Sequence, residues 1–485
     1  MSTQPLRESA PAAEGVDARG VEAFLDAIEA APDTEPHSVM ILRHGRLIAA
    51  GWWAPYSPDR VHLLYSLSKS FTATAAGLAA AEGLLNLDDP VIAYFPEFAA
   101  DITDAGSRSI LVRHVASMAS GHVTDIRVKA VEGDPAEPVR GFLLIPPDRD
   151  PGTVFTYNQA ATYTLAAIVQ KLTGQPLTQY LRPRLFDPLG IGQVFWQQYP
   201  RGRDVGYSGL HATTDAIARL GQLYLNGGVW EGKRVLPAWW VAEATRPQIS
   251  NAAQGATPDW QQGYGFQFWM SRHGYRGDGV YGQFCLVLPE QDAVIAMTAA
   301  SGQMQAMLDA VWDYLLPAFG PAALAYERPA DAGLRERLSR LELPQVPGGS
   351  GPTAFRGAEF TPRGGTCADQ PTLTAVSVTE AGDDGGYVLR LTEGNASLDL
   401  RCVVGRWTVS EPGAPVPAAV SVGWTGKDAV TFDVAFLETP HHLVVTCSLP
   451  DRTFAARWRT KSPNDGPLRL FQAPRLPVRV EERRR

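Results

Sequence analysis

The stretch Ser66-Leu67-Ser68-Lys69 places a hydroxyl and an amine one helical turn apart, at the start of a segment rich in alanine. Residues at i and i+3 share one face of a helix, so we expect the Ser66 and Lys69 side chains to be neighbours. The residues from Ser70 to Ala81 carry no charge, which predicts a helix buried on all sides. Ser66 would then lie at the N-terminus of a buried helix, where backbone N–H groups and the helix dipole stabilise an oxyanion.

Lysine is rare in this chain, which makes its presence at position 69 informative. Only six of the 43 basic residues are Lys, and the others are Arg. A desolvated Lys can lose its proton, whereas Arg cannot. A neutral Lys69 amine could therefore accept the Ser66 proton and turn a weak nucleophile into a strong one. The alternative interpretation is that Ser66 is an ordinary N-cap and Lys69 a solvated residue of the first turn.

Length and composition describe a globular protein with more than one core. The chain has 485 residues, of which 45% are hydrophobic and 19% charged. The net charge is -8 and basic residues do not cluster before the last three positions, so no nucleic-acid partner is expected. We expect no membrane span and, because the sequence from Met1 lacks a signal-peptide pattern, a cytoplasmic location. The four Cys show no metal-binding spacing, and neither a metal nor an organic cofactor is expected.

Hydrophobic periodicity predicts a mixture of helices and strands up to about residue 320. Helices are expected at 16–31, 66–85, 162–174, 213–226 and 304–319, and strands at 38–42, 46–53, 263–270, 282–288 and 293–299. Thr214 or Asp215 is the expected N-cap of the fourth of these helices.

The composition changes after residue 340. A Pro- and Gly-rich stretch from Pro344 to Pro352 has the character of a linker. Short alternating segments separated by turn residues follow it, with almost no helical pattern, and they predict a small all-β barrel or sandwich. We therefore expect a catalytic domain at 1–340, a linker at 341–354 and an all-β domain at 355–485.

A second polar element, Tyr157-Asn158-Gln159, follows the turn at Pro151-Gly152 and leads into a predicted helix. A Tyr in this place can face a cleft, although an isolated Tyr is more often a core residue that makes a hydrogen bond. With the Ser66 stretch and several further segments in order, the chain resembles the serine β-lactamase-related family over about residues 15–320. The segments that carry the resemblance are 64–72, 82–91, 112–122, 207–228 and 281–284.

That family includes class C β-lactamases, low-molecular-weight penicillin-binding proteins, esterases, D-aminopeptidases and nylon-oligomer hydrolases. The resemblance implies an α/β, transpeptidase-like catalytic domain, with an antiparallel sheet, flanking helices and a helical insert. The C-terminal all-β domain would be barrel-like, similar to a lipocalin. The implied roles are Ser66 as the acyl-accepting nucleophile, Lys69 as its general base and Tyr157 as the proton shuttle to the leaving group. The backbone N–H of Ser66 and one backbone N–H near Val280 would form the oxyanion hole.

Two departures from the family pattern bear on the substrate. The Tyr-x-Asn element has Gln159 in place of its Asn, and Asn158 is a partial substitute. The Lys-Thr-Gly or His-x-Gly element is best matched by Gly277-Asp278-Gly279, which has no cation at its first position. A carboxylate-binding Lys is thus missing, which favours an ester or amide substrate over a β-lactam. The expected substrate-binding residues are Asn158, Gln159, Gly279, Val280 and Tyr281.

Three functional hypotheses remain open at this point. The first is a serine hydrolase that cleaves a small-molecule or peptide ester or amide through an acyl-enzyme. The second is an acyltransferase or peptide-cyclising thioesterase of the same family. The third is a non-catalytic binding or sensor protein on this fold, which the missing cation favours and the retained Ser66, Lys69 and Tyr157 oppose. Weaker site candidates are His273 and Trp269, while His114, His122 and His211 are expected to be structural.

Overall fold

The computed structural model describes residues 5–253, 257–325, 328–348, 355, 357–381, 386–463 and 466–475. It divides into two compact units. The first comprises Met1–Val194 and Gln198–Pro344, and the second comprises Phe195–Gln197 and Gln345–Arg485. Residues 349–354 of the predicted linker lie outside the described residues.

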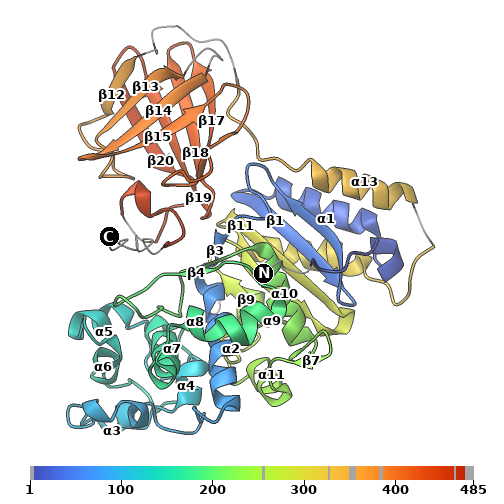
Figure 1. Ribbon diagram of the computed structural model, residues 1–485, viewed down its shortest axis with the longest axis vertical. Coiled ribbons are helices and arrows are strands. Elements are labelled where there is room, and N and C mark those ends of the chain that lie inside the picture. Colours follow the sequence, from blue (N-terminus) through green and yellow to red (C-terminus); the bar gives the residue numbers. More distant parts are fainter. Residues whose placement is uncertain are drawn as a thin grey trace, which may run out of the picture. The chain divides into compact units, whose positions relative to one another are not determined.

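A six-stranded antiparallel sheet forms the centre of the first unit, with the strand order β2-β1-β11-β10-β9-β8 (Figure 1). Its strands are β1 Thr34–Arg43, β2 Arg46–Trp52, β8 Trp269–Met270, β9 Tyr275–Gly279, β10 Gln283–Leu288 and β11 Ala293–Ser301. The strand β1 of the first hairpin therefore pairs with β11, which is the last strand of this sheet along the chain. The long chain segment between β2 and β8 contains the helices α2 to α11 and carries Ser66, Lys69 and Tyr157.

Helices cover both faces of this sheet. The helices α1 (Ala18–Ala30) and α13 (Arg328–Ser339) pack together on one side, against β1 and β2, while α10 (Thr214–Leu225) packs against β10 and β11 (Figure 1). In α1 the apolar face predicted from the sequence, which includes Val21, Phe24 and Ile28, is buried. Amphipathic periodicity thus placed this helix correctly.

The helical insert lies between the hairpin and α10, and α7 (Gln159–Thr173) runs through its centre (Figure 1). The helix α2 (Ser68–Ala81) packs against α7, and all its residues up to Ala79 are buried, as the uncharged alanine-rich segment predicted. The other helices here are α3 Ala105–Arg108, α4 Val112–Ala116, α5 Arg127–Gly133, α6 Pro138–Leu143, α8 Leu177–Leu181 and α9 Asp187–Leu189. The short elements β3 His62–Leu63, β5 Leu210–Ala212, β6 Val229–Trp230, β7 Lys233–Arg234 and α11 Ala238–Ala244 complete this part.

Three local expectations were wrong. The N-cap of α10 is Thr213 and neither Thr214 nor Asp215, because the Thr213 side chain accepts from the backbone N–H of Ala216. The strand expected at 263–270 is reduced to Trp269–Met270, because Gly263 and Gln267 have φ of 105° and 61° and break the extended run.

The helix expected at 304–319 is also interrupted. The α-helix α12 covers Met304–Ala310. A turn of π-helix at Val311–Leu315 and a turn of 3₁₀-helix at Leu316–Ala318 follow it. Pro317 lacks a backbone N–H, so it cannot continue the pattern of bonds four residues back. The sequence pattern did not reveal the change of helix type, because apolar residues of the π-helical turn, such as Val311 and Leu315, are still buried.

The second unit is a nearly closed, barrel-like sheet of nine strands, in the order β15-β14-β13-β12-β20-β19-β18-β17-β16 (Figure 1). Its edges approach each other where β15 lies against β17. The strands are β12 Ala358–Pro362, β13 Ala375–Ala381, β14 Gly386–Glu393, β15 Ala396–Cys402, β16 Thr408–Val409, β17 Ala418–Gly426, β18 Ala429–Phe436, β19 His441–Ser448 and β20 Thr453–Trp458. Apolar side chains such as Phe360, Phe432 and Val445 fill its core. The all-β expectation for this region is confirmed.

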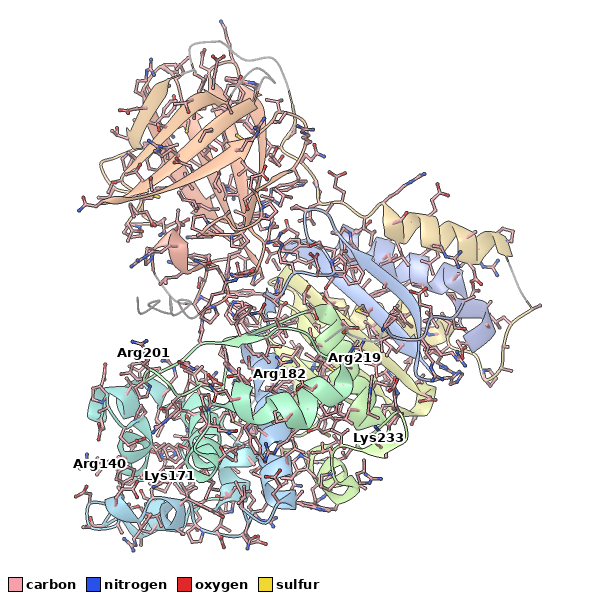
Figure 2. All side chains as sticks on the ribbon, in the orientation of Figure 1. Arg140, Lys171, Arg182, Arg201, Arg219 and Lys233 are labelled. Carbon is pink, nitrogen blue, oxygen red and sulfur yellow. The ribbon has the colours of Figure 1, made fainter. Side chains whose placement is uncertain are left out.

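Several basic side chains on the surface of the first unit are paired with acids. Arg140 lies 2.8 Å from Asp101, and Lys171 bonds to Glu97 at 2.5 Å; Figure 2 shows both cations on the helical insert. Among the described residues, no helix has the length and apolar character that crossing a membrane requires.

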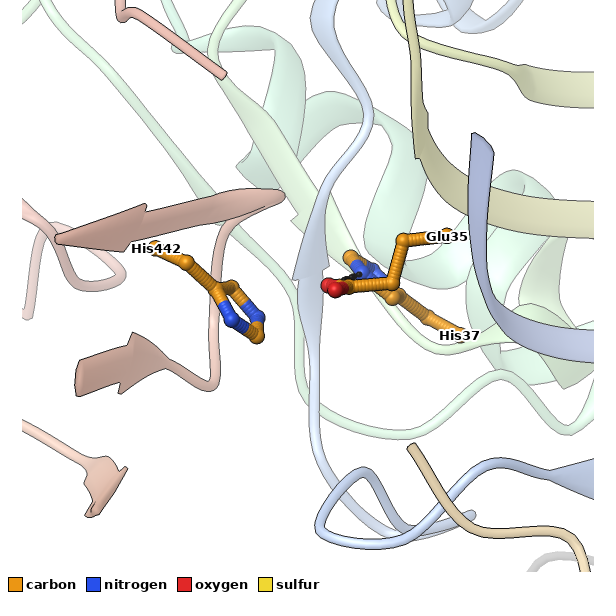
Figure 3. Close-up of side chains that lie close together, drawn as sticks. All are labelled: Glu35, His37 and His442. Carbon is orange, nitrogen blue, oxygen red and sulfur yellow. Dashed lines mark hydrogen bonds and ion pairs between the residues drawn. The ribbon is translucent and has the colours of Figure 1, made fainter. Parts of the chain in front are cut away.

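On strand β1, Glu35 accepts a hydrogen bond from the ring of His37 at 3.2 Å (Figure 3).

Candidate active site

Ser66 lies in a tight turn, Tyr65–Leu67, that leads directly into α2. Tyr65 has a φ of 47°, a left-handed conformation that non-glycine residues adopt at a cost in energy. The hydroxyl of Ser68 stabilises the turn, because it donates to the Tyr65 carbonyl at 2.5 Å and accepts from the Leu210 N–H at 3.0 Å. Ser66 is partly exposed, so its hydroxyl is accessible from outside the helix.

Lys69 is buried directly beneath this serine. Its side chain is only 1% exposed, and Nζ lies 3.0 Å from the Ser66 Oγ and 2.7 Å from the carbonyl oxygen of Tyr207. Burial lowers the pKa of Lys69 to about 7, and the charges of Asp125 and Asp278 act in the opposite direction. A substantial fraction of the amine is therefore neutral near pH 7 and able to accept the Ser66 proton.

Tyr157 borders the same two side chains. The Lys69 Nζ lies 4.7 Å from the centre of the Tyr157 ring, which stacks on Trp269 at 5.2 Å and meets Tyr264 edge-on at 6.3 Å. Burial raises the pKa of Tyr157 well above its ordinary value, while hydrogen bonds with Ser66 and Trp269 act to lower it. The phenol thus keeps its proton at neutral pH. Of the two candidate bases, Lys69 is the one that is free to take a proton from Ser66.

The two residues after Tyr157 have different places in the structure. Asn158 is fully buried and caps α7, with its Oδ1 accepting from the Ala160 N–H at 3.1 Å. That contact gives Asn158 a structural role. The backbone N–H of Gln159 donates to Asp125 at 3.0 Å, and its side-chain Oε1 is buried without a hydrogen-bond partner among the described residues.

Strand β9 brings the Gly277-Asp278-Gly279 element against the Ser66 turn. A Cβ atom on Gly279 would lie 2.2 Å from the Leu64 carbonyl oxygen, and one on Gly277 would lie 2.3 Å from Leu67. Only glycine permits this approach. Val280, next along the chain, is 38% exposed, and Tyr281 has a φ of 71° with its ring 5.7 Å from that of Tyr65. These residues therefore border the turn that carries the nucleophile.

Asp278 is paired with a buried arginine. The Arg276 Nε donates to the Asp278 Oδ2 at 2.9 Å, and the Arg276 guanidinium lies 4.4 Å above the ring centre of Trp260. Burial raises the pKa of Asp278, whereas the Arg276 charge lowers it. Sequence reasoning missed Arg276, because its distance from the nucleophile along the chain hides its place in the sheet. Its position one residue before Gly277 was the only available signal.

The fold and the site together define a serine hydrolase with a catalytic unit of the β-lactamase type. The family model described as "Beta-lactamase" matches residues 24–316. The chain therefore belongs to the Beta-lactamase family, as its resemblance implied.

Three known proteins illustrate the similarity. The 6-aminohexanoate-dimer hydrolase of Paenarthrobacter ureafaciens is 28% identical in an alignment of 285 residues that covers 54% of this chain and 72% of that protein. Penicillin-binding protein 4 of Amycolatopsis lactamdurans is 27% identical over 282 residues, covering 50% and 73%. Among solved structures, the hydrolase EstCE1, described as having promiscuous acyltransferase activity, matches with a TM-score of 0.50 and 19% identity over 61% of this chain and 99% of its own. This last likeness shows the fold alone.

Proposed function

We propose that the protein hydrolyses an ester or amide through an acyl group carried on Ser66. The observation that supports this most strongly is the 3.0 Å contact between the Ser66 Oγ and the buried Lys69 Nζ, whose pKa is lowered to about 7. Neutral Lys69 accepts the Ser66 proton as Oγ attacks the carbonyl carbon. The negative charge that forms on the carbonyl oxygen is stabilised by the backbone N–H groups of Ser66 and Val280.

Tyr157 completes the proton path in this proposal. Its phenol keeps its proton at neutral pH and hydrogen-bonds with Ser66, so it can donate to the leaving group and recover a proton from Lys69. In the second half of the reaction, water attacks the acyl-enzyme and its proton follows the same path in reverse. Gln159, Gly279, Val280 and Tyr281 are proposed to contact the substrate, and Asn158 to hold α7 in place. A cytoplasmic location stays a prediction.

Comparison of the parent protein with a Ser66→Ala variant tests this function on a panel of short 4-nitrophenyl esters and anilides. Ser109→Ala is a matched control, because Ser109 is an exposed serine of the helical insert. We expect turnover to fall to the uncatalysed rate in Ser66→Ala and to stay at the parent rate in Ser109→Ala. Parent-level turnover by Ser66→Ala would show that another residue is the nucleophile. Product analysis with added amines would reveal transfer in place of hydrolysis.

A further inference from the structure

An ion pair on strand β9 takes no part in the proposed mechanism, although it lies beside the residues that carry it out. Arg276 and Asp278 are two positions apart in β9, so their side chains lie on the same face of the strand. The Arg276 Nε donates to the Asp278 Oδ2 at 2.9 Å. The Arg276 side chain is fully buried, and that of Asp278 is 6% exposed. Because little water reaches the pair, its charges act on their surroundings with little screening.

Further hydrogen bonds hold the guanidinium of Arg276 in place. Its Nη1 donates to the carbonyl oxygens of Asp259 at 2.9 Å and Met270 at 3.1 Å, and to the hydroxyl of Ser271 at 2.6 Å. These bonds join β9 to the neighbouring strand and to the segment before it. Since the guanidinium is fixed, the carboxylate that it binds is fixed as well.

A row of aromatic rings connects this ion pair with Lys69. The Arg276 guanidinium lies 5.8 Å from the ring centre of Trp269, and the Trp269 ring stacks on that of Tyr157 at 5.2 Å. The Lys69 Nζ lies 4.7 Å from the centre of the Tyr157 ring. The ion pair and the amine are therefore neighbours of the same two aromatic side chains.

Two carboxylates act on the charge of Lys69. Those of Asp125 and Asp278 both raise the pKa of the amine, against the larger effect of burial. Asp125 is exposed, so solvent screens its charge, whereas Asp278 is buried. Burial raises the pKa of Asp278, and the Arg276 charge lowers it. Arg276 therefore favours the ionised form of the carboxylate that acts on Lys69 from inside the protein.

The phenols around Lys69 carry no charge at neutral pH. Burial raises the pKa of Tyr157, Tyr207 and Tyr264, so each keeps its proton. The half-buried Arg127 lies 5.8 Å from the ring centre of Tyr207 and hydrogen-bonds with its side chain. The buried charges that Lys69 meets are thus those of the ion pair on β9.

We propose that Arg276 and Asp278 are positioning residues of the Ser66 site, and that the charge of their ion pair sets the pH at which the Lys69 amine becomes the base. This inference rests on the proposed Ser66 hydrolysis and names residues that control it. Asp278 stabilises the ammonium that forms when Lys69 takes the Ser66 proton. Arg276 limits this stabilisation, because it binds the same carboxylate and neutralises its charge.

The pH profile of kcat/KM with a neutral 4-nitrophenyl ester tests the proposal. Asp278→Asn removes the negative charge and keeps an acceptor for the Arg276 Nε. It leaves the Arg276 charge uncompensated, so the midpoint of the profile should move to lower pH by about one unit. Arg276→Gln leaves the Asp278 charge uncompensated and should move the midpoint to higher pH by a similar amount. The double variant loses both charges, so its midpoint should return towards that of the parent.

Asp101→Asn is the matched control, because it removes the same charge from an ion pair with Arg140 at 2.8 Å in the helical insert. Its midpoint should equal that of the parent. A loss of kcat with an unchanged midpoint in both Asp278→Asn and Arg276→Gln would overturn the proposal, since that is the result of a purely structural role. Midpoints that move in the same direction in these two variants would also overturn it.

A titration of Lys69 itself separates this proposal from the proposed function. The chain has six Lys, so protein labelled with ¹³C in its lysine side chains gives few signals, and the one missing in Lys69→Arg belongs to Lys69. The chemical shift of its Cε against pH reports the pKa without any substrate. We expect this pKa to be lower in Asp278→Asn and higher in Arg276→Gln, each by about one unit.

The two measurements together decide which claim fails. An unchanged Lys69 titration in both variants would overturn the role of the ion pair, whatever the kinetics show. Shifted titrations with an unmoved kcat/KM profile would support the effect of the ion pair on Lys69, and would contradict the proposed role of Lys69 as the base for Ser66.

Discussion

At the scale of single residues, the pKa of Lys69 determines how the enzyme should respond to pH. The neutral amine is the form that accepts the Ser66 proton, and burial lowers its pKa to about 7. Below that pH the amine is charged and inactive as a base, so kcat/KM should rise as the pH increases through about 7. Tyr157, whose pKa is raised, keeps its proton over the same range. A pH profile with a neutral ester tests this, and a profile that falls between pH 6 and 8 would contradict it.

A substitution at Lys69 separates charge from proton transfer. We expect Lys69→Arg to be nearly as inactive as Lys69→Ala, with kcat lower by about 10²-fold or more, because Arg keeps its proton. Steady-state kinetics on the ester panel provide the measurement, with circular dichroism to show that each variant is folded. If Lys69→Arg kept a tenth or more of the parent activity, Lys69 would act as a cation only.

Asp278 leads to a prediction about substrate charge. The Gly277-Asp278-Gly279 element has no cation at its first position, and the carboxylate of Asp278 is already paired with Arg276. This element therefore offers the carboxylate of a β-lactam neither a free cation nor a hydroxyl to bind. A short-chain ester carries no carboxylate, so it does not depend on such a partner. We expect a higher kcat/KM for a short 4-nitrophenyl ester than for a chromogenic cephalosporin. A clear preference for the cephalosporin would refute this reasoning.

At the scale of elements, the close approach of β9 to the Ser66 turn is set by glycine. Because a Cβ atom on Gly279 would lie 2.2 Å from the Leu64 carbonyl oxygen, Gly279→Ala must displace the strand or the turn. We expect a loss of about 1–3 kcal/mol in the free energy of unfolding and about ten-fold or more in kcat/KM. Gly192→Ala is the control, since no atom lies within 4 Å of its added Cβ. Equal thermal stability and activity of the two variants would show that β9 does not constrain the turn.

The sequence predicted those parts of the fold that depend on local patterns. The buried helix after Ser66, the amphipathic α1 and the first hairpin follow from side-chain periodicity, which neighbouring residues carry. The strand expected at 263–270 failed because Gln267 adopts a positive φ and uses its side chain to bond the carbonyl of Ala116 at 2.7 Å. Such a contact joins residues about 150 positions apart, so no local pattern reports it.

In the candidate site, too, local patterns were predictable from the sequence and contacts between distant residues were not. Ser66 and Lys69 follow from a spacing of three residues, whereas the family resemblance was needed to give Tyr157 a role. The contacts of Lys69 with the Tyr207 carbonyl and of Tyr157 with Trp269 join residues that are far apart in the sequence, so they arise only in the folded protein. The sequence indicated that burial would lower the pKa of Lys69, but not by how much, because the extent of burial is a property of the packed structure.

At the scale of the whole molecule, the chain consists of a catalytic unit and a β unit that each have a hydrophobic core. Phe432 is fully buried in the second core, so Phe432→Ala should lower the stability of that unit by about 3–5 kcal/mol. Hydrogen exchange provides the measurement, and we expect faster exchange in β17–β20. The exposed Val409→Ala is the control and should leave exchange unchanged. Unchanged exchange in Phe432→Ala would mean that this core does not hold the strands together.

The central claim is that the acyl group is carried by Ser66, and mass spectrometry of the enzyme quenched in acid during turnover tests it most directly. With a slowly hydrolysed ester, the account predicts one added acyl mass on the peptide that contains Ser66, and none in Ser66→Ala. The initial rate at which this mass appears should increase when the pH is raised from 6 to 8, as Lys69 loses its proton. An acyl group on a different residue, or turnover by Ser66→Ala at the parent rate, would contradict the account.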